Sequence, residues 1–578
     1  MKPIIYQILP RLLNKCETCV HNGDITVNGS GKMNDFTPKV LAEIKKLGIT
    51  HIWYTGVIEH AHATDYSEFG ITPDNPHVVK GKAGSPYAIS DYYDIDPDIA
   101  VSVPDRMAEF ENLVKRTHNA GMKVIIDFVP NHVARRYCSD AKPNGIEDFG
   151  VNDDTTKFFD PNNNFYYITR QLFAPTIDLG DGDDAYIEFP AKASGNDCFT
   201  AFPGRNDWYE TVKLNYGVDY GDHSTHFDPI PSTWMKMLHI LRYWASKGID
   251  GFRCDMVFMV PLEFWEWAIP QVKKHYPEII FIAEIYDVSL YRDFLSKGHF
   301  DYLYDKVNLY DTLRGIQCHN FSAAQLTSCW QTVEGIGPKM LNFLENHDEQ
   351  RFASEQYAAD PALVIPSLVV SSTISTGPMM IYAGQELGEP AADAEGFSGH
   401  DGRTTIFDYW SIPTLRRWFN HGDPGVTKLT ARERWLRELY SKILNLCNKE
   451  DAISQGSFFD LMYVNYQNPS LNPHRHFVYL RSFNDVTLLI AANFSHNTAD
   501  LRINIPSDAF NMLNIPRGTV EATDLLTGER SGKILSDNVP FDTFIAPHNA
   551  VIWKIEHSKI KTGRKKSPSD NKNTTQNN

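Results

Sequence analysis

Short apolar runs recur along the chain, and their spacing constrains the fold more than any other feature of the sequence. Continuous apolar runs such as KVIIDFV at 123–129 are typical of parallel strands buried on both faces. Most of the intervening segments have helical spacing. Eight strands alternating with helices predict the α/β class and a (β/α)8 TIM barrel. The runs lie at residues 3–9, 50–54, 123–129, 248–255, 279–283, 302–304, 340–344 and 378–382.

Two further segments depart from this alternation. Residues 134–231 are rich in Asp, Asn, Gly, Tyr and Phe and have few helical periods, which predicts a loop-rich domain inserted after the third strand. The barrel then comprises residues 1–133 and 232–452. Short alternating runs at 458–466, 476–481, 487–493 and 550–555 predict a C-terminal antiparallel β-sandwich over residues 453–556. The basic, polar residues 557–578 are expected to be disordered.

Composition limits the partners and the compartment. A net charge of −17 argues against nucleic acid or an anionic membrane as the main partner. No stretch reaches the ~18 apolar residues of a transmembrane helix, and the N-terminal run does not resemble a signal peptide. The eight cysteines are scattered, as is typical of reduced thiols. We therefore expect a cytoplasmic protein with neither a nucleic-acid nor a membrane partner, while its oligomeric state stays open.

Polar residues follow four of the predicted strands, and in a barrel of this type the carboxyl ends of the strands form the active site. Three carboxylates are therefore expected to meet at one mouth, with an arginine and two histidines between them. The residues at these ends are Asp127, Asn131 and His132 after the third strand, Arg253 and Asp255 after the fourth, Glu284 after the fifth, and Asn346, His347 and Asp348 after the seventh.

The surroundings of Asp255 and Glu284 predict opposite protonation states. Arg253 lies two residues before Asp255, so both side chains point from the same face of a strand, and the guanidinium favours the ionised carboxylate. Glu284 follows the apolar run FIA, so burial should raise its pKa. A carboxylate beside a protonated carboxyl is the pair that cleaves glycosides. A structural ion pair and a metal-dependent lyase or hydrolase are the alternatives.

Four motifs also carry a resemblance. They are similar, in order and in position, to the four signature regions of the α-amylase family of glycoside hydrolases, family 13, whose members share the barrel, the inserted domain and the C-terminal β domain. The motifs are DFVPNH at 127–132, GFRCD at 251–255, AE at 283–284 and ENHD at 345–348.

The resemblance implies a role for each matching residue. Asp255 would be the nucleophile, Glu284 the general acid/base and Asp348 the third carboxylate, which stabilises the distorted sugar. The residues that match sugar-binding positions are His132, Arg253 and His347. Asp127 and Asn131 match a structural pair of the family, in which the asparagine is often a calcium ligand.

Three further segments resemble family features, although ordinary loop structure is the alternative for each. SPYAISDY at 85–92 contains Tyr87, which would stack on the sugar, and Asp91, which would orient the loop. VKLN at 212–215 resembles the fifth signature of the neopullulanase and oligosaccharide-cleaving branch. DGRT at 401–404 contains Arg403, which could reach the sugar.

One segment differs from the family pattern. MVFMV follows Asp255 where many starch-degrading members have Lys-His, a pair that contributes to the leaving-group subsites and to calcium binding. We expect a retaining hydrolase of α-1,4 bonds in maltooligosaccharides or in glycogen- or starch-derived dextrins. It would require no cofactor and would at most hold a structural calcium. A transglycosylase on the same scaffold and a catalytically inactive sugar-binding protein are the alternatives.

Overall fold

The computed structural model describes residues 2–561, and the chain divides into two compact units. The first unit contains the residues up to Phe321 and Ser328–Lys449, and the second contains Ser322–Thr327 and the chain from Glu450 onward. Within residues 2–561, no helix has both the length and the apolar composition needed to cross a membrane.

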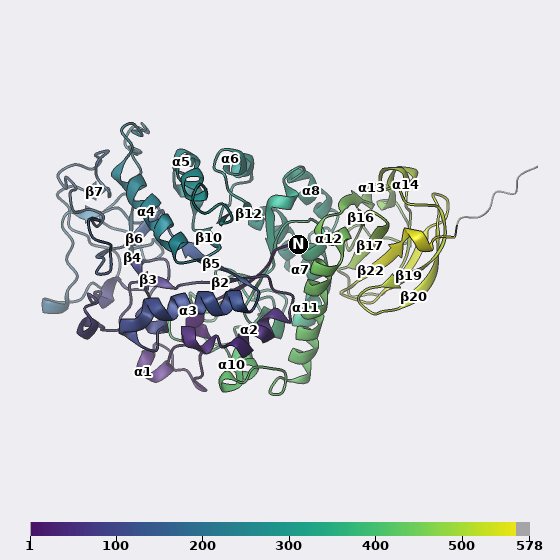
Figure 1. Ribbon diagram of the computed structural model, residues 1–578, viewed down its shortest axis with the longest axis horizontal. Helices are drawn as coiled ribbons and strands as arrows, with labels where there is room; N and C mark the ends of the chain where they lie inside the picture. The colour runs from purple at the N-terminus through teal and green to yellow at the C-terminus, as the bar shows by residue number, and fades with distance from the viewer. Residues whose placement is uncertain (1, 562–578) are drawn as a thin grey trace, which may run out of the picture. The chain divides into compact units, whose positions relative to one another are not determined.

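Eight parallel strands of the first unit close into a barrel, which confirms the predicted fold (Figure 1). Around the barrel the order is β1-β14-β13-β12-β11-β10-β5-β2, so neighbours in space are neighbours along the chain. The strands are β1 (Ile4–Ile8), β2 (His51–Tyr54), β5 (Lys123–Phe128), β10 (Gly251–Cys254), β11 (Ile280–Ala283), β12 (Tyr302–Tyr304), β13 (Met340–Phe343) and β14 (Met379–Tyr382).

Helices lie between these strands, as the helical spacing of the intervening segments predicted. For example, α2 begins where Thr37 accepts a hydrogen bond from the amide of Val40 and Pro38 takes the first helical position, a combination that favours helix starts. The helices of this unit are α1 (Ile25–Asn28), α2 (Pro38–Lys45), α3 (Arg106–Asn119), α4 (Ser232–Ser246), α5 (Leu262–Lys273), α6 (Tyr291–Ser296), α7 (Asp311–Cys318), α9 (Ile365–Thr373), α10 (Pro413–Phe419) and α11 (Ala431–Lys449), while α8 (Gln325–Thr332) begins in the second unit.

Strand β10 illustrates how the barrel separates its core from its site. Phe252 is fully buried and packs on Phe128 and Phe281 of the two neighbouring strands, on the side that faces the helices. Because side chains alternate along a strand, Arg253 projects to the opposite side, into the barrel. Gly251 permits the close approach of β11, since a Cβ there would lie 2.6 Å from the Ile280 side chain.

The segment between β5 and α4 has a small core of its own. It is built from two short antiparallel pairs, and Ile168, Phe173, Ala191 and Ala201 pack together with Val78, which comes from the chain before β4. A further pair, β3 with β4, precedes it. The strands are β3 (Ile58–His60), β4 (Ile89–Ile95), β6 (His132–Ala134), β7 (Tyr167–Ile168), β8 (Ala191–Lys192) and β9 (Thr211–Lys213), where β6 pairs with β9 and β7 with β8.

The second unit is an antiparallel β domain, as predicted. Six strands form one sheet in the order β15-β16-β17-β22-β19-β20, and β18 pairs with β21 in a second sheet. The strands are β15 (Ser457–Asp460), β16 (His476–Phe483), β17 (Val486–Asn493), β18 (Ala499–Ile503), β19 (Gly518–Asp524), β20 (Arg530–Leu535), β21 (Phe541–Ile545) and β22 (Asn549–Glu556), and the helices are α12 (Asp451–Ser454), α13 (Met462–Asn465) and α14 (Ser507–Met512).

Two details of this unit differ from the prediction. The strand expected over residues 458–466 ends at Asp460, because the Asp460 carboxylate accepts the amide of Met462 and the chain turns into α13. Residues 557–561, which were assigned to a disordered tail, are ordered: His557–Lys559 form a 3-10 turn, and Lys561 pairs with Thr519. The rest of that tail, 562–578, lies outside the described residues.

Candidate active site

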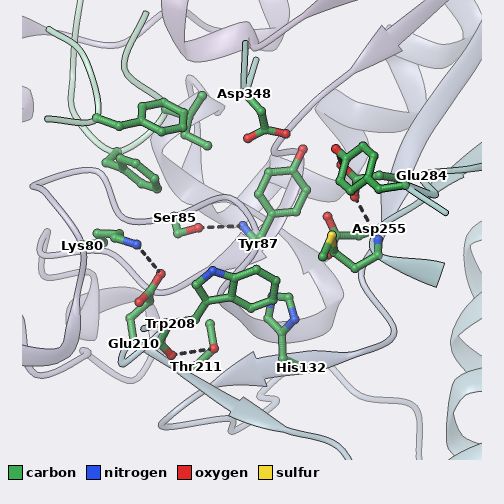
Figure 2. A pocket seen from close by; sticks show the side chains of 15 residues that line it. Lys80, Ser85, Tyr87, His132, Trp208, Glu210, Thr211, Asp255, Glu284 and Asp348 are labelled. Carbon is green, nitrogen blue, oxygen red and sulfur yellow. Dashed lines mark hydrogen bonds and ion pairs between the residues drawn. The ribbon is translucent and has the colours of Figure 1, made fainter. Parts of the chain in front are cut away.

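A cavity of about 350 Å³ lies at the carboxyl ends of the barrel strands, beside the inserted segment (Figure 2). All three predicted carboxylates lie on its wall. It also contains aromatic side chains from loops that are far apart in the sequence. The lining residues are Lys80, Ser85, Tyr87, His132, Trp208, Glu210, Thr211, Asp255, Met256, Glu284, Tyr286, Asp348, Phe397, Ile406 and Phe407.

Asp255 follows β10 directly and is nearly fully buried. Its Oδ1 accepts a 2.8 Å hydrogen bond from Arg253 Nη1, whereas Oδ2 has no hydrogen-bond partner within residues 2–561. Burial raises the pKa of Asp255 despite the opposing charge of Arg253. Arg253 thus favours the ionised carboxylate, as expected, but burial has the larger effect on the pKa of Asp255. Oδ2 is the oxygen of this carboxylate whose hydrogen bonding is incomplete.

Glu284 follows β11 and contacts the same Arg253 guanidinium as Asp255. Arg253 Nη2 lies 2.6 Å from Glu284 Oε1, which also accepts a 2.6 Å hydrogen bond from the Tyr286 hydroxyl, and the amide of Met256 donates to Oε2. Burial raises the pKa of Glu284 to about 7, against the lowering effect of Arg253. The direction agrees with the sequence-based expectation, so this carboxyl can hold a proton near neutral pH.

The backbone at Met256 is in a left-handed conformation, with φ +44° and ψ +46°. Few residues with a side chain adopt this conformation, and it is concentrated at functional sites. At this position it directs the Met256 amide toward Glu284 Oε2, 2.9 Å away. The turn after Asp255 thus connects the two carboxyls through the main chain as well as through Arg253.

Arg253 is held inside the barrel and does not line the cavity. Its carbon centre lies 5.2 to 5.7 Å from the ring centres of Trp53, Tyr87 and Tyr304, and Nη1 also donates to Asp127. Asp127 in turn accepts a 2.9 Å hydrogen bond from Trp53. Arg253 therefore lies where it holds carboxylates in place, and its predicted contact with a sugar stays a prediction.

Asp348 follows β13 and lines the cavity above Tyr87 in Figure 2, and 37 % of its side chain is exposed. Burial and the charges of Glu284 and Asp255 raise its pKa well above the usual range, although water at the exposed edge weakens this effect. His347 Nε2 lies 2.6 Å from the Tyr87 hydroxyl and 3.1 Å from Asp348 Oδ2. His347 therefore positions Tyr87 and Asp348 from behind, and only the latter two line the cavity.

His132 lines the cavity beside Trp208, with the ring centres 5.1 Å apart. Burial and the charge of Lys213 lower the pKa of His132 to about 3, so its ring is neutral at neutral pH, with one nitrogen that donates a hydrogen bond and one that accepts. Tyr87 lines the same wall, stacked on His347 at 5.2 Å. These two predicted residues lie where a ligand can contact them.

Arg403 lies behind the cavity. Its Nε donates a 2.7 Å hydrogen bond to the main-chain oxygen of Asp348, and Nη1 pairs with Asp401. It is absent from the cavity wall. The structure thus places Arg403 where it holds the loop that carries Asp348, and its predicted contact with a sugar stays a prediction.

The surroundings of Asn131 do not suit calcium. Lys213 Nζ donates to Asn131 Oδ1, pairs with Asp197 Oδ1 at 2.7 Å and donates to the main-chain oxygen of Met259 at 3.0 Å. An ammonium group therefore occupies the centre of the oxygens that would bind a cation. Across residues 2–561, no group of three or more His, Cys, Asp or Glu side chains could hold a metal ion.

Sequence reasoning missed one wall of the cavity, which is formed by Lys80, Trp208, Glu210, Phe397 and Phe407. None of these residues follows a barrel strand or belongs to a quoted motif. The only available signal was the position of Glu210, three residues before Lys213 in the VKLN motif.

Comparison with known proteins identifies the family. The family profile described as "Alpha amylase, catalytic domain" matches residues 19–172 and 229–408. Alpha-amylase MalA of Haloarcula japonica is 25 % identical over 349 residues, which is 60 % of this chain and 40 % of that protein. Alpha-amylase 2 of Dictyoglomus thermophilum is 24 % identical over 422 residues, 72 % of this chain and 58 % of that protein. The match thus spans less than two thirds of the length of each of these relatives.

Solved structures share the fold at low identity. The maltogenic α-amylase AmyB of Thermotoga neapolitana superposes with a TM-score of 0.61 at 19 % identity, covering 96 % of this chain and 98 % of that one. The debranching enzyme of Nostoc punctiforme gives a TM-score of 0.63 at 18 % identity, covering 95 % and 97 %. The family profile covers more than half of the chain, including the strand ends that carry all three carboxylates. The chain therefore belongs to the α-amylase family.

Proposed function

We propose that the chain is a retaining glycoside hydrolase that cleaves α-1,4 bonds in maltooligosaccharides or in glycogen- or starch-derived dextrins. The observation that carries this proposal is the sharing of one guanidinium by two carboxyls: Arg253 Nη1 bonds Asp255 and Nη2 pairs with Glu284. The charge of Asp255 also raises the pKa of Glu284, so the two carboxyls lie close together. Such closeness supports the separation of ~5–5.5 Å that retaining enzymes use, rather than the wider spacing of inverting ones.

The two carboxyls have complementary tasks in this mechanism. Asp255 attacks the anomeric carbon through Oδ2, while Glu284 gives its proton to the leaving oxygen, and a covalent glycosyl-enzyme forms. Glu284, now ionised, then takes a proton from the attacking water, and the released sugar keeps its α configuration. Arg253 stabilises whichever of the two carboxyls is charged at each stage.

The remaining residues bind or position the sugar. We assign Asp348 to the hydroxyls of the distorted ring, and Tyr87 and His132 to its faces and edges, because all three line the cavity. Arg253, His347 and Arg403 lie behind these groups and keep them in place. The resemblance of VKLN to the oligosaccharide-cleaving branch stays a prediction.

We further propose that neither a cofactor nor a calcium ion at Asn131 is required, since the Lys213 ammonium binds the same oxygens. All eight cysteines, which lie within the described residues, are free thiols. Free thiols support the cytoplasm as the compartment. The α-glucan is the proposed partner.

Replacement of the nucleophile tests the mechanism. Asp255→Asn should lower kcat on p-nitrophenyl maltooligosaccharides by at least about 10⁴-fold, because removing a nucleophile abolishes the covalent route. Asp287→Asn, the same substitution at an exposed turn, should leave kcat unchanged. Polarimetry or NMR of the first products of the unmodified enzyme should show the α anomer. Normal turnover by Asp255→Asn, or a β product, would refute the proposed mechanism.

Transfer to a second sugar is the other candidate function. The α-1,4-glucan:maltose-1-phosphate maltosyltransferase of Rhodospirillum rubrum is 30 % identical to this chain over 207 residues, 35 % of this chain and 27 % of that protein. Hydrolysis and transfer share the covalent intermediate and differ only in the acceptor. Products from concentrated maltotriose separate the two: chains longer than the substrate indicate transfer.

A further inference from the structure

The cavity ends in an ion pair on the side away from the catalytic carboxyls. Lys80 Nζ lies 3.3 Å from Glu210 Oε1, and both residues line the cavity. In Figure 2 this pair lies across Tyr87 and Trp208 from Asp255 and Glu284. The mechanism proposed above does not use the pair.

Both members of the pair are fixed by their neighbours. Lys80 follows Val78, which packs into the core of the inserted segment, and Val79, which is buried with Ala61. Glu210 directly precedes β9, and its main-chain oxygen accepts a hydrogen bond from the Arg135 amide. The pair therefore joins two segments that are anchored independently, which is the rigidity that a specific binding group needs.

Glu210 has an unused acceptor. The residue is only 4 % exposed, and its Oε2 has no hydrogen-bond partner within residues 2–561. A buried carboxylate oxygen without a partner is unfavourable unless a ligand completes it. Lys80 also has unused donors, because its ammonium pairs with one carboxylate oxygen and otherwise lies over the rings of Phe407 and Tyr209, at 5.1 and 6.0 Å.

The position of the pair identifies the ligand atoms. A pyranose that presents its anomeric carbon to Asp255 and its leaving oxygen to Glu284 has carbons 4 and 6 on the opposite edge of the ring. We propose that the Lys80–Glu210 pair binds the O4 and O6 hydroxyls of the non-reducing terminal sugar, so that the enzyme cleaves α-glucans from their non-reducing ends. The O4 hydroxyl donates to Glu210 Oε2, and the Lys80 ammonium donates to O6.

The volume of the cavity agrees with the proposed binding of a non-reducing terminal sugar. Its volume of about 350 Å³ is near the lower end of ligand sites, which span roughly 300–1,000 Å³. An internal sugar of a long chain carries a glycosidic bond at O4 instead of a free hydroxyl, and it would leave the Glu210 acceptor unpaired. The hydrogen bond that completes the Glu210 carboxylate is therefore the same contact that recognises a chain end.

A blocked substrate tests the inference, which rests on the proposed hydrolysis of α-glucans. The unmodified enzyme is given p-nitrophenyl maltotrioside and the same compound with a 4,6-O-ethylidene bridge on its non-reducing sugar, and products are separated by chromatography. We expect kcat/KM to be at least about tenfold lower for the blocked compound, because sites built around a hydroxyl reject analogues that lack it. Equal cleavage of both would overturn end recognition and leave the hydrolase assignment intact, whereas cleavage of neither would overturn both.

Two variants test whether the Lys80–Glu210 pair causes the preference for the unblocked substrate. Glu210→Ala and Lys80→Met should each lower kcat/KM for the unblocked compound by about 10- to 150-fold, the value of a hydrogen bond to a charged group, while leaving the blocked compound unaffected. A purely structural defect would lower both rates equally and would refute the proposal. Lys157→Met removes a lysine from an exposed ion pair of the same segment and should match the unmodified enzyme.

Thermal melting of each variant establishes that the fold is intact. If Glu210→Ala does not fold, Lys80→Met provides the same comparison. The ratio of kcat/KM for the two substrates, measured with the unmodified enzyme, tests recognition of the chain end without any variant.

Discussion

The hydrogen bond between Tyr286 and Glu284 offers a quantitative test of the proposed acid. The Tyr286 hydroxyl donates to Glu284 Oε1 at 2.6 Å. Burial raises the pKa of Glu284 to about 7, and the Tyr286 hydrogen bond opposes this rise because it favours the ionised carboxylate. Tyr286→Phe removes only the hydroxyl, so the pKa of Glu284 should rise further.

The sign and size of the effect follow from the mechanism. Glu284 must be protonated to act as the acid, so kcat/KM falls as the pH rises through about 7. A hydrogen bond to a charged group contributes about 1.5–3 kcal/mol, and 1.36 kcal/mol corresponds to one pKa unit. Water in the cavity replaces part of this bond, so we expect the alkaline limb to move upward by about one pH unit. The midpoint of the alkaline limb is an apparent pKa of the interacting carboxyls as a group.

The assay is the pH profile of kcat/KM on a p-nitrophenyl maltooligosaccharide from pH 5 to 9. Tyr291→Phe is the matched control, since the Tyr291 hydroxyl is buried and has no hydrogen-bond partner within residues 2–561. Its profile should coincide with that of the unmodified enzyme. An alkaline limb that stays in place or moves downward in Tyr286→Phe would show that Glu284 is not the acid.

Two further predictions concern stability. Lys213→Met should destabilise the fold by about 2–4 kcal/mol, because it leaves Asn131 and Asp197 without their cation. A chelator should not change the melting temperature of the unmodified protein. A large decrease in that temperature with the chelator would contradict the placement of Lys213. Phe252→Ala should lower the free energy of unfolding in urea by about 3–5 kcal/mol, because Phe252 is fully buried between Phe128 and Phe281, and a loss below about 1 kcal/mol would contradict its role in the core.

The barrel was predictable because its signals are local. A buried strand such as β5 needs only a short apolar run, and the carboxyl end of each strand fixes where the next residue points. Asp255, Glu284 and Asp348 therefore met as expected, since each follows its strand within a few residues. In the second unit the apolar pattern continued past the end of β15. The strand stops there because the Asp460 carboxylate accepts the Met462 amide, a side-chain contact that an apolar pattern does not reveal.

Properties that depend on packing were not predictable in the same way. The pKa of Asp255 is set first by burial, which raises it, and the neighbouring Arg253 reveals only the smaller, opposing effect. The Lys80–Glu210 pair joins residues 130 positions apart. No local pattern marks such a pair, because each residue alone is an ordinary charged side chain of a loop.

Asn131 and Lys213 show how the same kind of long-range contact changes a functional inference. The motif around Asn131 suggested a cation ligand, and the VKLN motif was read separately as a family signature. Pairing of β6 with β9 places His132 opposite Lys213, which brings the ammonium to the Asn131 oxygen. The same ammonium reaches Asp197 in the inserted segment and the Met259 carbonyl after β10, so it connects the insert to the catalytic strand. A covalently attached cation performs this connection at any metal concentration.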